Sequence, residues 1–261
     1  MVFGSKINFF SVLFYKIIFV FVINLSFSQN GENYFKTGND FYNNGQFEKA
    51  LDSYFKVLDE DYHSAELYFN IGNTYYKLDS TAQSIFYFEK AKKMSPIDQE
   101  ILNNLSYAEN MKIDLIEKLP KSQIENFQVY LFNLFSTNQW GYILVSLIWF
   151  FCILFSLYYL VSNSRLKKIF FLITSLFFLL ITFTFTIGTQ KSIYDSSLTE
   201  AIIFEKQISV NDEPNDRSEV LFNLHEGTKV NIIEKLENWL KIKLENGAEG
   251  WIKSKGIKQI D

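Results

Sequence analysis

The sequence predicts a multidomain membrane protein that joins an all-α domain of helical hairpins, two transmembrane helices and a small all-β barrel. Three observations lead to this prediction. Residues 31–98 contain a pattern that repeats at a fixed spacing, residues 140–161 and 169–188 are long apolar runs without a charge, and short β-rich segments separated by turn residues fill residues 198–261. In chain order, the helical domain precedes the apolar runs and the barrel follows them.

The composition agrees with lipid contact and argues against several kinds of active site. Hydrophobic residues make up 48% of the chain, and this apolar surface needs burial in protein or lipid. The single cysteine, Cys152, lies inside an apolar run, which excludes an intramolecular disulfide, a thiolate zinc site and an iron–sulfur cluster. The two histidines, His63 and His225, lack a neighbouring catalytic motif. We therefore expect no cofactor and no enzymatic activity.

The charge distribution bears on the partners of the chain. Residues 31–120 and 195–261 each carry more acidic than basic side chains. An acidic surface repels phosphate backbones, so we expect no nucleic-acid partner. Neither block offers a polybasic strip for anionic lipid, so membrane attachment has to be hydrophobic.

Residues 1–28 have the features of a secretory signal peptide. Lys6 and Lys16 precede an apolar core that is too short to cross a bilayer, and the small residues Ser26 and Ser28 suit cleavage after Ser28. The alternative is an uncleaved N-terminal anchor. On either interpretation, we expect the residues that follow to be exported.

Residues 140–161 and 169–188 are each long enough to cross the hydrocarbon core as a helix. The turn between them, residues 162–168, contains Arg165, Lys167 and Lys168 and no acid, and the positive-inside rule places such a turn in the cytoplasm. Both flanking blocks are then periplasmic, which agrees with the signal peptide. The sequence predicts a two-pass protein of the bacterial inner membrane.

Residues 120–139 form an amphipathic linker before the first span. Ser122 and Glu125 fit a capping box, and apolar residues follow at helical spacing. One interpretation is a short helix on the surface of the outer leaflet. The alternative is a helix that packs on the preceding domain.

Within residues 31–98, equivalent residues recur 34 positions apart. The pairs are Tyr34 and Tyr68, Gly38 and Gly72, Phe41 and Tyr75, Ala50 and Ser84, Tyr54 and Phe88, and Val57 and Ala91. This pattern resembles the tetratricopeptide repeat (TPR), with repeats at 31–64 and 65–98 and a capping helix at 99–119. The residues expected to have structural roles in the repeats are Gly38, Ala50, Gly72, Ser84 and Pro96.

In folds of this family the first helix of each hairpin lines a concave groove. Carried over by position, the groove residues are Phe35, Asn39, Tyr42 and Asn43 from the first hairpin and Phe69, Asn73, Tyr76 and Lys77 from the second. Aromatic rings give rigid contact area and amides can bond a peptide backbone, so we expect a groove that binds a protein segment. The alternative is that several of these rings only pack between the hairpins.

The C-terminal segment reads as a series of short strands. They are predicted at Ala201–Phe204, Ile208–Val210, Lys229–Glu234, Trp239–Leu244 and Gly250–Lys253. Glu226-Gly227 and Asn246-Gly247 are turn signals between them, and the sequence Gly247-x-x-Gly250-Trp251-Ile252 that follows resembles the bacterial SH3-like domain. We expect Trp251 to fill the interior of the barrel and Trp239 to line a surface groove.

The order of these segments is similar to that of the Bacteroides aerotolerance BatE family. The similarity includes Leu102-Asn103-Asn104-Leu105 and Glu117-Lys118-Leu119-Pro120 after the repeats, Asn138-Gln139-Trp140 at the first span and Leu221 to Thr228 in the barrel. The resemblance implies an envelope assembly that includes membrane proteins with von Willebrand A domains and a link to oxygen and stress tolerance. The family resemblance supplies no molecular activity.

The sequence therefore predicts a non-enzymatic scaffold or adaptor of the inner membrane, which presents a TPR groove and an SH3-like domain to the periplasm. The alternative is a membrane protein that binds or senses peptidoglycan through its SH3-like domain. Both hypotheses use the same topology, and they differ in the partner of the barrel.

Overall fold

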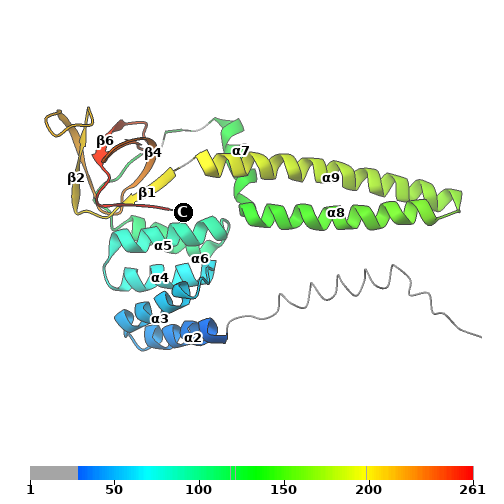
Figure 1. Ribbon diagram of the computed structural model, residues 1–261, viewed down its shortest axis with the longest axis horizontal. Helices are drawn as coiled ribbons and strands as arrows, with labels where there is room; N and C mark the ends of the chain where they lie inside the picture. The colour runs from blue at the N-terminus through cyan, green and yellow to red at the C-terminus, as the bar shows by residue number, and fades with distance from the viewer. Residues whose placement is uncertain (1–28, 118, 121, 198, 261) are drawn as a thin grey trace, which may run out of the picture. The chain divides into compact units, whose positions relative to one another are not determined.

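The computed structural model describes residues 29–261 except 118, 121, 198 and 261, and the predicted signal peptide lies outside the described residues (Figure 1). The chain divides into two compact units, Met1–Tyr62 and His63–Asp261.

In the described part of the first unit, α2 (Gln29–Asn43) and α3 (Phe47–Asp59) form a helical hairpin. Gly38 allows the close approach of the two helices, because a Cβ at this position would lie only 2.7 Å from Tyr54 Cδ1. Ala50 and Tyr54 are buried on the facing side of α3. Gly45 turns the chain between the helices with a φ of 72°. The predicted first hairpin is thus observed.

The second unit begins with an equivalent hairpin, α4 (Ala65–Lys77) and α5 (Thr81–Met94). A Cβ at Gly72 would lie 2.7 Å from Phe88 Cδ1, which repeats the contact of Gly38 with Tyr54. Ser84 is fully buried, and its hydroxyl donates to the carbonyl of Gly72 at 3.0 Å. Pro96 lies in the turn that follows α5. This hairpin also agrees with the sequence prediction.

Helix α6 (Gln99–Glu109) is shorter than predicted. Asp98 caps its first turn by accepting from the backbone N–H of Glu100 at 2.9 Å. The capping helix was expected to run to residue 119, and this prediction of its length is wrong. Beyond the helix, Asp114 binds the barrel and the backbone N–H of Leu119 donates to the carbonyl of Glu245 at 3.1 Å. These contacts with distant residues replace the bonds of further helical turns.

Helix α7 (Gln123–Asn133) begins at the predicted capping box, in which Ser122 and Glu125 bond reciprocally. Its buried side chain, Phe132, packs against Tyr194 of α9 with a centroid distance of 5.6 Å. Ile124 and Phe127 remain exposed on the outer side of the helix. The linker is therefore an amphipathic helix anchored to the end of the next hairpin.

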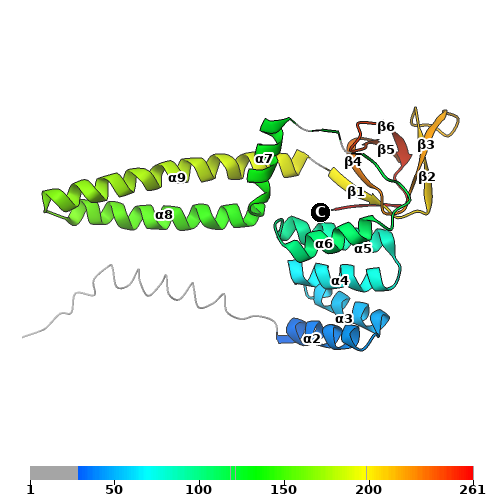
Figure 2. The same ribbon diagram turned by 180° about the vertical axis from the view of Figure 1, so that it is seen from behind.

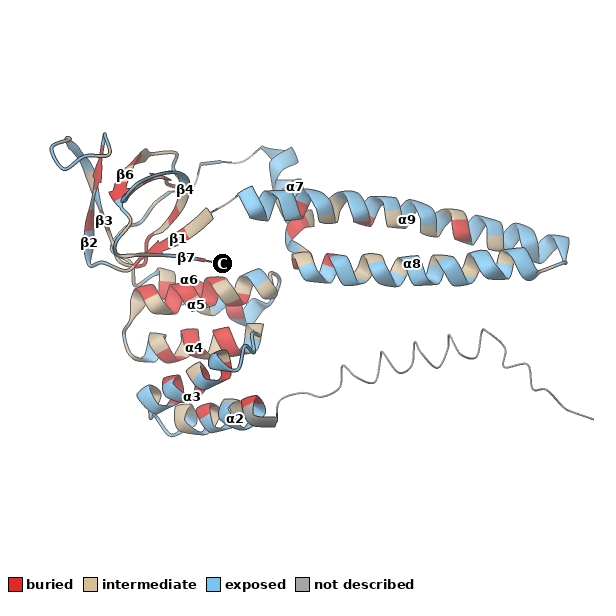
Figure 3. Ribbon diagram, in the orientation of Figure 1, coloured by how far each residue is buried: buried red, intermediate tan, exposed pale blue. Residues whose placement is uncertain are grey.

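Helices α8 (Thr137–Leu160) and α9 (Ser164–Ser197) form the long antiparallel hairpin labelled in Figure 1. Among the described residues, these are the two helices long and apolar enough to cross a membrane. Figure 3 shows both helices as exposed over most of their length. The exposed side chains include large apolar ones such as Phe150, Phe171 and Phe183. An exposed apolar surface of this extent indicates contact with lipid or a partner.

The ends of the hairpin differ from the prediction. Arg165, Lys167 and Lys168 lie in the first turns of α9, because Asn163 caps that helix by accepting from the backbone N–H of Arg165 at 2.9 Å. The predicted seven-residue turn is therefore wrong in extent, and the chain turns within residues 161–163. At the other end, α9 continues past residue 188 to Ser197.

The C-terminal part is an antiparallel sheet. Its strands are β1 (Thr199–Ile203), β2 (Gln207–Asn211), β3 (Val220–His225), β4 (Lys229–Leu236), β5 (Trp239–Lys243), β6 (Glu249–Lys253) and β7 (Ile257–Gln259). Within the described residues the strand order is β3-β2-β6-β5-β4-β1-β7. Figure 2 labels strands β1 to β6 of this sheet. Side chains from β1 to β6 meet in one core, which requires the sheet to curl around them. The prediction missed β3 and β7.

Trp251 of strand β6 lies on the opposite face of the sheet from the one expected. Gly250 and Ile252 are buried and Trp251 is half-buried between them, outside the core cluster. Because side chains alternate along a strand, Trp251 lies on the other face of the sheet from Ile252. The prediction that Trp251 fills the interior is wrong. Gly250 permits close strand approach, since a Cβ there would overlap Val210 Cγ1.

The barrel packs on the second helical hairpin inside the second unit. Ile202 and Ile260 are buried in a cluster with Ile85, Phe86 and other apolar residues of α5 and α6. Phe86 also contacts Phe204 edge to face, with a centroid distance of 5.7 Å. The barrel thus covers the apolar face that a further helical repeat would otherwise bury.

Candidate functional site

A groove on the barrel surface is the first candidate site. It has a volume of about 390 Å³, and Trp239 at the start of β5 forms part of its wall. Other lining residues are Ile208, Asn211, Asp216, Lys253 and Lys255. The structure thus places the predicted surface tryptophan beside a hollow that contains apolar, amide and charged groups.

Charge in this groove is organised around Lys253. Its Nζ lies 2.7 Å from Asp216 Oδ1 and 5.7 Å from the centre of the Trp239 ring. Asn211 is buried at the groove, and its Nδ2 donates to the carbonyl of Asn215 at 3.1 Å. Glu205 and Lys255 also line the groove, so it combines an aromatic wall with charged groups of both signs that can orient a peptide.

The predicted groove residues of α2 divide into two kinds. The ring of Phe35 packs on that of Tyr54 with a centroid distance of 5.9 Å. Asn39 Oδ1 accepts a hydrogen bond from the hydroxyl of Tyr54 at 2.7 Å. Tyr42 is half-buried, and Asn43 is exposed. Tyr42 also contacts Phe47 of α3 edge to face, with a centroid distance of 5.5 Å. Phe35, Asn39 and Tyr42 therefore pack within the hairpin, whereas Asn43 is accessible to a partner.

The equivalent residues of α4 also include packed and exposed side chains. Phe69 packs on Phe88 with a centroid distance of 5.8 Å, and Asn73 Oδ1 accepts from Nδ2 of Asn104 in α6 at 2.7 Å. Tyr76 and Lys77 are exposed at the end of the helix. Phe69 and Asn73 thus have the same internal role as Phe35 and Asn39, whereas Tyr76 is exposed and its counterpart Tyr42 packs within the first hairpin.

No pattern in the sequence predicts the ion-pair network between α5 and the barrel. Lys229 of β4 lies 3.1 Å from Glu89 Oε2 of α5 and 2.8 Å from Glu200 Oε1 of β1. Burial alone would raise the pKa of Glu89, but the positive charges of Lys229 and Lys92 overcome it and lower the pKa to about 2. Burial would lower the pKa of Lys229, but Glu89 and Glu200 raise it above its ordinary value. Each charge therefore stabilises the other across the contact.

Asp114 was also missed, because its partners lie more than a hundred positions away. Its Oδ2 accepts from the backbone N–H of His225 at 2.6 Å and from the Thr228 hydroxyl at 2.7 Å, and its Oδ1 lies 2.8 Å from His225 Nδ1. Burial opposes ionisation of Asp114, yet these hydrogen bonds lower its pKa below the ordinary value. The carboxylate fixes the turn between β3 and β4.

Within the described ranges, no group of three or more His, Cys, Asp or Glu side chains is arranged to hold a metal ion.

Family models of known proteins match both the helical repeats and the C-terminal sheet. Residues 212–258 match a family described as bacterial SH3 domain, residues 38–79 match one described as TPR repeat, and residues 65–98 match one described as tetratricopeptide repeat. No curated protein matches the chain. The predicted fold class is confirmed, since a TPR-like helical region, two apolar helices and an SH3-like sheet are all present. Both matched modules are of kinds that bind other molecules without catalysing a reaction.

Proposed function

We propose that this chain is a non-enzymatic scaffold of the bacterial inner membrane, which holds a TPR module and an SH3-like module on the periplasmic side for assembly of an envelope complex. The observation that carries this proposal is the hairpin between the two modules. Both matched families are interaction modules, and one pair of apolar helices joins them.

The geometry of the hairpin supports presentation of both modules at one membrane face. The hydroxyl of Thr137 at the start of α8 donates to Asp195 Oδ2 near the end of α9 at 2.6 Å. The chain therefore leaves the hairpin at the end where it entered. If both helices cross a bilayer, the preceding and following domains share one side of it.

The positive charges support the orientation of this proposal. Arg165, Lys167 and Lys168 lie at the closed end of the hairpin, and basic residues of this kind are retained in the cytoplasm. The open end then faces the periplasm. The predicted signal peptide at residues 1–28 argues for the same orientation.

The resemblance to the BatE family suggests the identity of the partners. We propose membrane proteins with von Willebrand A domains as neighbours and a contribution to oxygen or stress tolerance through them. This part of the proposal depends on the motifs of the linking segments. It would be tested by crosslinking in cells, followed by mass spectrometry of the proteins bound to the full chain.

The helical surface is tested by removing two tyrosine rings of the predicted groove. We expect Tyr42→Ala combined with Tyr76→Ala to reduce capture of the crosslinked partners several-fold, because large rings supply much of the contact energy in such surfaces. Tyr62→Ala is the matched control, since Tyr62 is also an exposed tyrosine but lies outside the predicted groove. Equal capture by the double variant and the control would contradict the groove assignment.

Peptidoglycan binding by the barrel is the second candidate function, and the groove beside Trp239 is the observation that favours it. Stem peptides carry carboxylates, which Lys253 and Lys255 could attract. The detergent-solubilised full chain should sediment with purified cell wall, and Trp239→Ala or Lys253→Ala should abolish sedimentation. Lys243→Ala removes an exposed charge outside the groove and should have no effect. Sedimentation that is unaffected by both groove variants would reject this candidate.

A further inference from the structure

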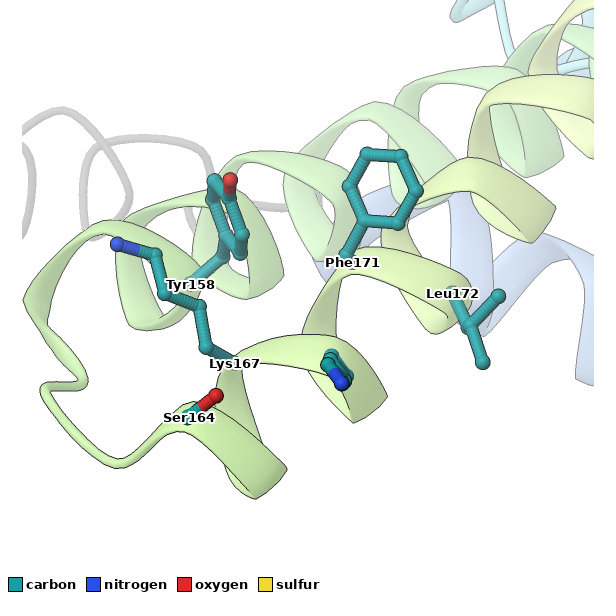
Figure 4. Close-up of a pocket in the computed structure, with 6 residues that line it drawn as sticks. Tyr158, Ser164, Lys167, Phe171 and Leu172 are labelled. Carbon is teal, nitrogen blue, oxygen red and sulfur yellow. The ribbon is translucent and has the colours of Figure 1, made fainter.

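The closed end of the α8–α9 hairpin carries a hollow that none of the functions above uses. It has a volume of about 400 Å³ and is lined by Tyr158, Ser164, Lys167, Lys168, Phe171 and Leu172. Figure 4 shows Lys167 extended toward the Tyr158 ring, with Phe171 and Leu172 farther along the hairpin. Polar and basic groups therefore lie near the turn, and apolar groups lie on the side toward the middle of the hairpin.

The basic groups in and beside the hollow have no counter-charge nearby. Within the part of the chain that the structure describes, no ion pair joins Arg165, Lys167 or Lys168 to a carboxylate. Lys167 Nζ lies 5.3 Å from the centre of the Tyr158 ring, which holds it over the hollow. The positive end of the α9 dipole lies at the same place. The hollow therefore favours an anion.

An apolar groove continues from this hollow along the hairpin. It has a volume of about 550 Å³ and shares Tyr158 and Phe171 with the basic hollow. Phe151, Phe155 and Phe178 form much of the remaining wall. A ligand that fills both spaces needs an anionic head and a hydrocarbon chain.

Thr174 provides a polar group inside this apolar groove. It is only 7% exposed, and its hydroxyl has no hydrogen-bond partner. Thr182 and Thr186, in contrast, donate to carbonyls four residues earlier, at 3.0 and 2.9 Å. A buried hydroxyl without a partner is costly, and a ligand acceptor in the groove would relieve this cost once the Thr174 side chain turns toward it. At 1.5 Å per residue, Thr174 lies about 10 Å along α9 from Lys167.

We propose that the closed end of the hairpin binds one anionic phospholipid. Lys167 and Lys168 hold the phosphate, one acyl chain follows the groove formed by Phe151, Phe155 and Phe178, and the Thr174 hydroxyl donates to an ester carbonyl. Phospholipid esters lie on the hydrocarbon side of the phosphate. Thr174 likewise lies on the apolar side of Lys167 and Lys168, toward the middle of the hairpin. Basic pockets between transmembrane helices at the cytoplasmic surface are a known kind of lipid site. The inference rests on the bilayer insertion contained in the proposed function, and it is independent of the partners of the two modules.

Native mass spectrometry of the purified full chain in detergent tests the proposal. With added phosphatidylglycerol we expect one retained lipid, and with phosphatidylcholine much weaker retention. The double variant Lys167→Ala and Lys168→Ala should bind phosphatidylglycerol at least about tenfold more weakly. Lys206→Ala, which removes an exposed charge from the barrel, should bind like the parent chain. Equal retention of both lipids, or an equal loss in the control, would overturn the proposal.

Thr174→Val keeps the shape of the side chain and removes the hydroxyl. It should weaken binding of the diester lipid several-fold and leave binding of a diether phosphatidylglycerol unchanged, because the diether has no ester carbonyl. A matching loss for both lipids would contradict the assigned role of Thr174. Inorganic phosphate at the lipid concentration should fail to displace the lipid, and displacement would identify a simple phosphate site instead.

Two controls separate failure of this inference from other failures. The double variant Lys167→Arg and Lys168→Arg retains charge and should retain both the lipid and the melting temperature of the parent chain. Loss of binding in both double variants at an unchanged melting temperature would overturn the proposal. Flotation of the full chain with liposomes tests insertion itself. A chain that fails to float contradicts the proposed function as well, whereas a chain that floats without lipid preference contradicts only the lipid site.

Discussion

At the scale of single residues, the contact of Lys229 with Glu89 and Glu200 unites two modules that are distant in sequence. Glu89 is only 4% exposed, so its charge is stable there only because Lys229 and Lys92 lie within 3.5 Å. Removing one member of a buried pair leaves the other without compensation. The ion pair therefore adds a specific charged contact to the apolar packing of the barrel on α5.

Lys229→Met should lower the free energy of unfolding of the second unit by about 3 kcal/mol, because it leaves the Glu89 carboxylate buried beside an apolar side chain. The measurement is urea unfolding of the solubilised full chain, followed by tryptophan fluorescence. Lys243→Met is the matched control, since Lys243 pairs with Glu249 at the surface, and its effect should be much smaller. Equal losses would show that the buried pair has no special role.

The same pair predicts a dependence on pH. The pKa of Glu89 falls from an ordinary value of 4.5 to about 2 in the folded chain, so the unfolded chain binds more protons between these values. The stability that Glu89 contributes is complete above pH 4.5 and is lost as the pH falls toward 2. The difference in unfolding free energy between the parent chain and Glu89→Gln should therefore shrink as the pH decreases from 5 to 3. A difference that stays constant over this range would contradict the prediction.

At the scale of elements, the segment that follows α6 connects the helical repeats to the barrel. Residues 110–117 leave the helical array and run to the barrel, where Asp114 bonds His225 and Thr228 and where Ile116 packs against the barrel core. Helix α6 ends where these contacts begin. One extended segment thus replaces two further helical turns and attaches the barrel to the repeats.

Asp114→Asn should loosen this segment, because an amide replaces one of the accepting carboxylate oxygens. We expect limited proteolysis of the solubilised chain within residues 110–117 to become about tenfold faster. Glu117→Gln changes an exposed acid of the same segment and should leave the rate unchanged. Faster cleavage in both variants would indicate that overall acidity, rather than the Asp114 bonds, protects the segment.

At the scale of the whole molecule, the hairpin determines which parts of the chain share a compartment. The proposed topology places Ser162 in the cytoplasm and the exposed Lys206 of the barrel in the periplasm. In this proposed topology the two positions lie on opposite sides of the membrane, and both are exposed in the structure. Cys152, the single native cysteine, lies in α8 and can be removed for labelling.

In a Cys152→Ser chain, Lys206→Cys should react with a membrane-impermeant maleimide in cells whose outer membrane has been permeabilised. Ser162→Cys should react only after the cells are lysed, because the inner membrane shields the cytoplasm. The ratio of labelling before and after lysis gives the orientation of each site. The reverse pattern would place both interaction modules in the cytoplasm and reject the proposed presentation to the periplasm.

Local patterns predicted most of the elements. The 34-residue spacing placed both helical hairpins, the uncharged runs placed α8 and α9, and the turn glycines Gly227 and Gly247 adopt the positive φ values that tight turns need. The candidate sites were predicted less completely. Trp239 lies at a groove as expected, whereas Asn39 and Asn73 turned out to bond Tyr54 and Asn104 inside the helical domain.

The sequence by itself determined the classes of element, because helical periodicity, strand propensity and apolar length are properties of neighbouring residues. Only the tertiary structure decided that Glu89 meets Lys229, that Asp114 holds the turn of the barrel and that Ile252 rather than Trp251 enters the core. These outcomes depend on which distant surfaces exclude water from each other. That competition involves the whole folded unit, and no local spacing along the chain records its result.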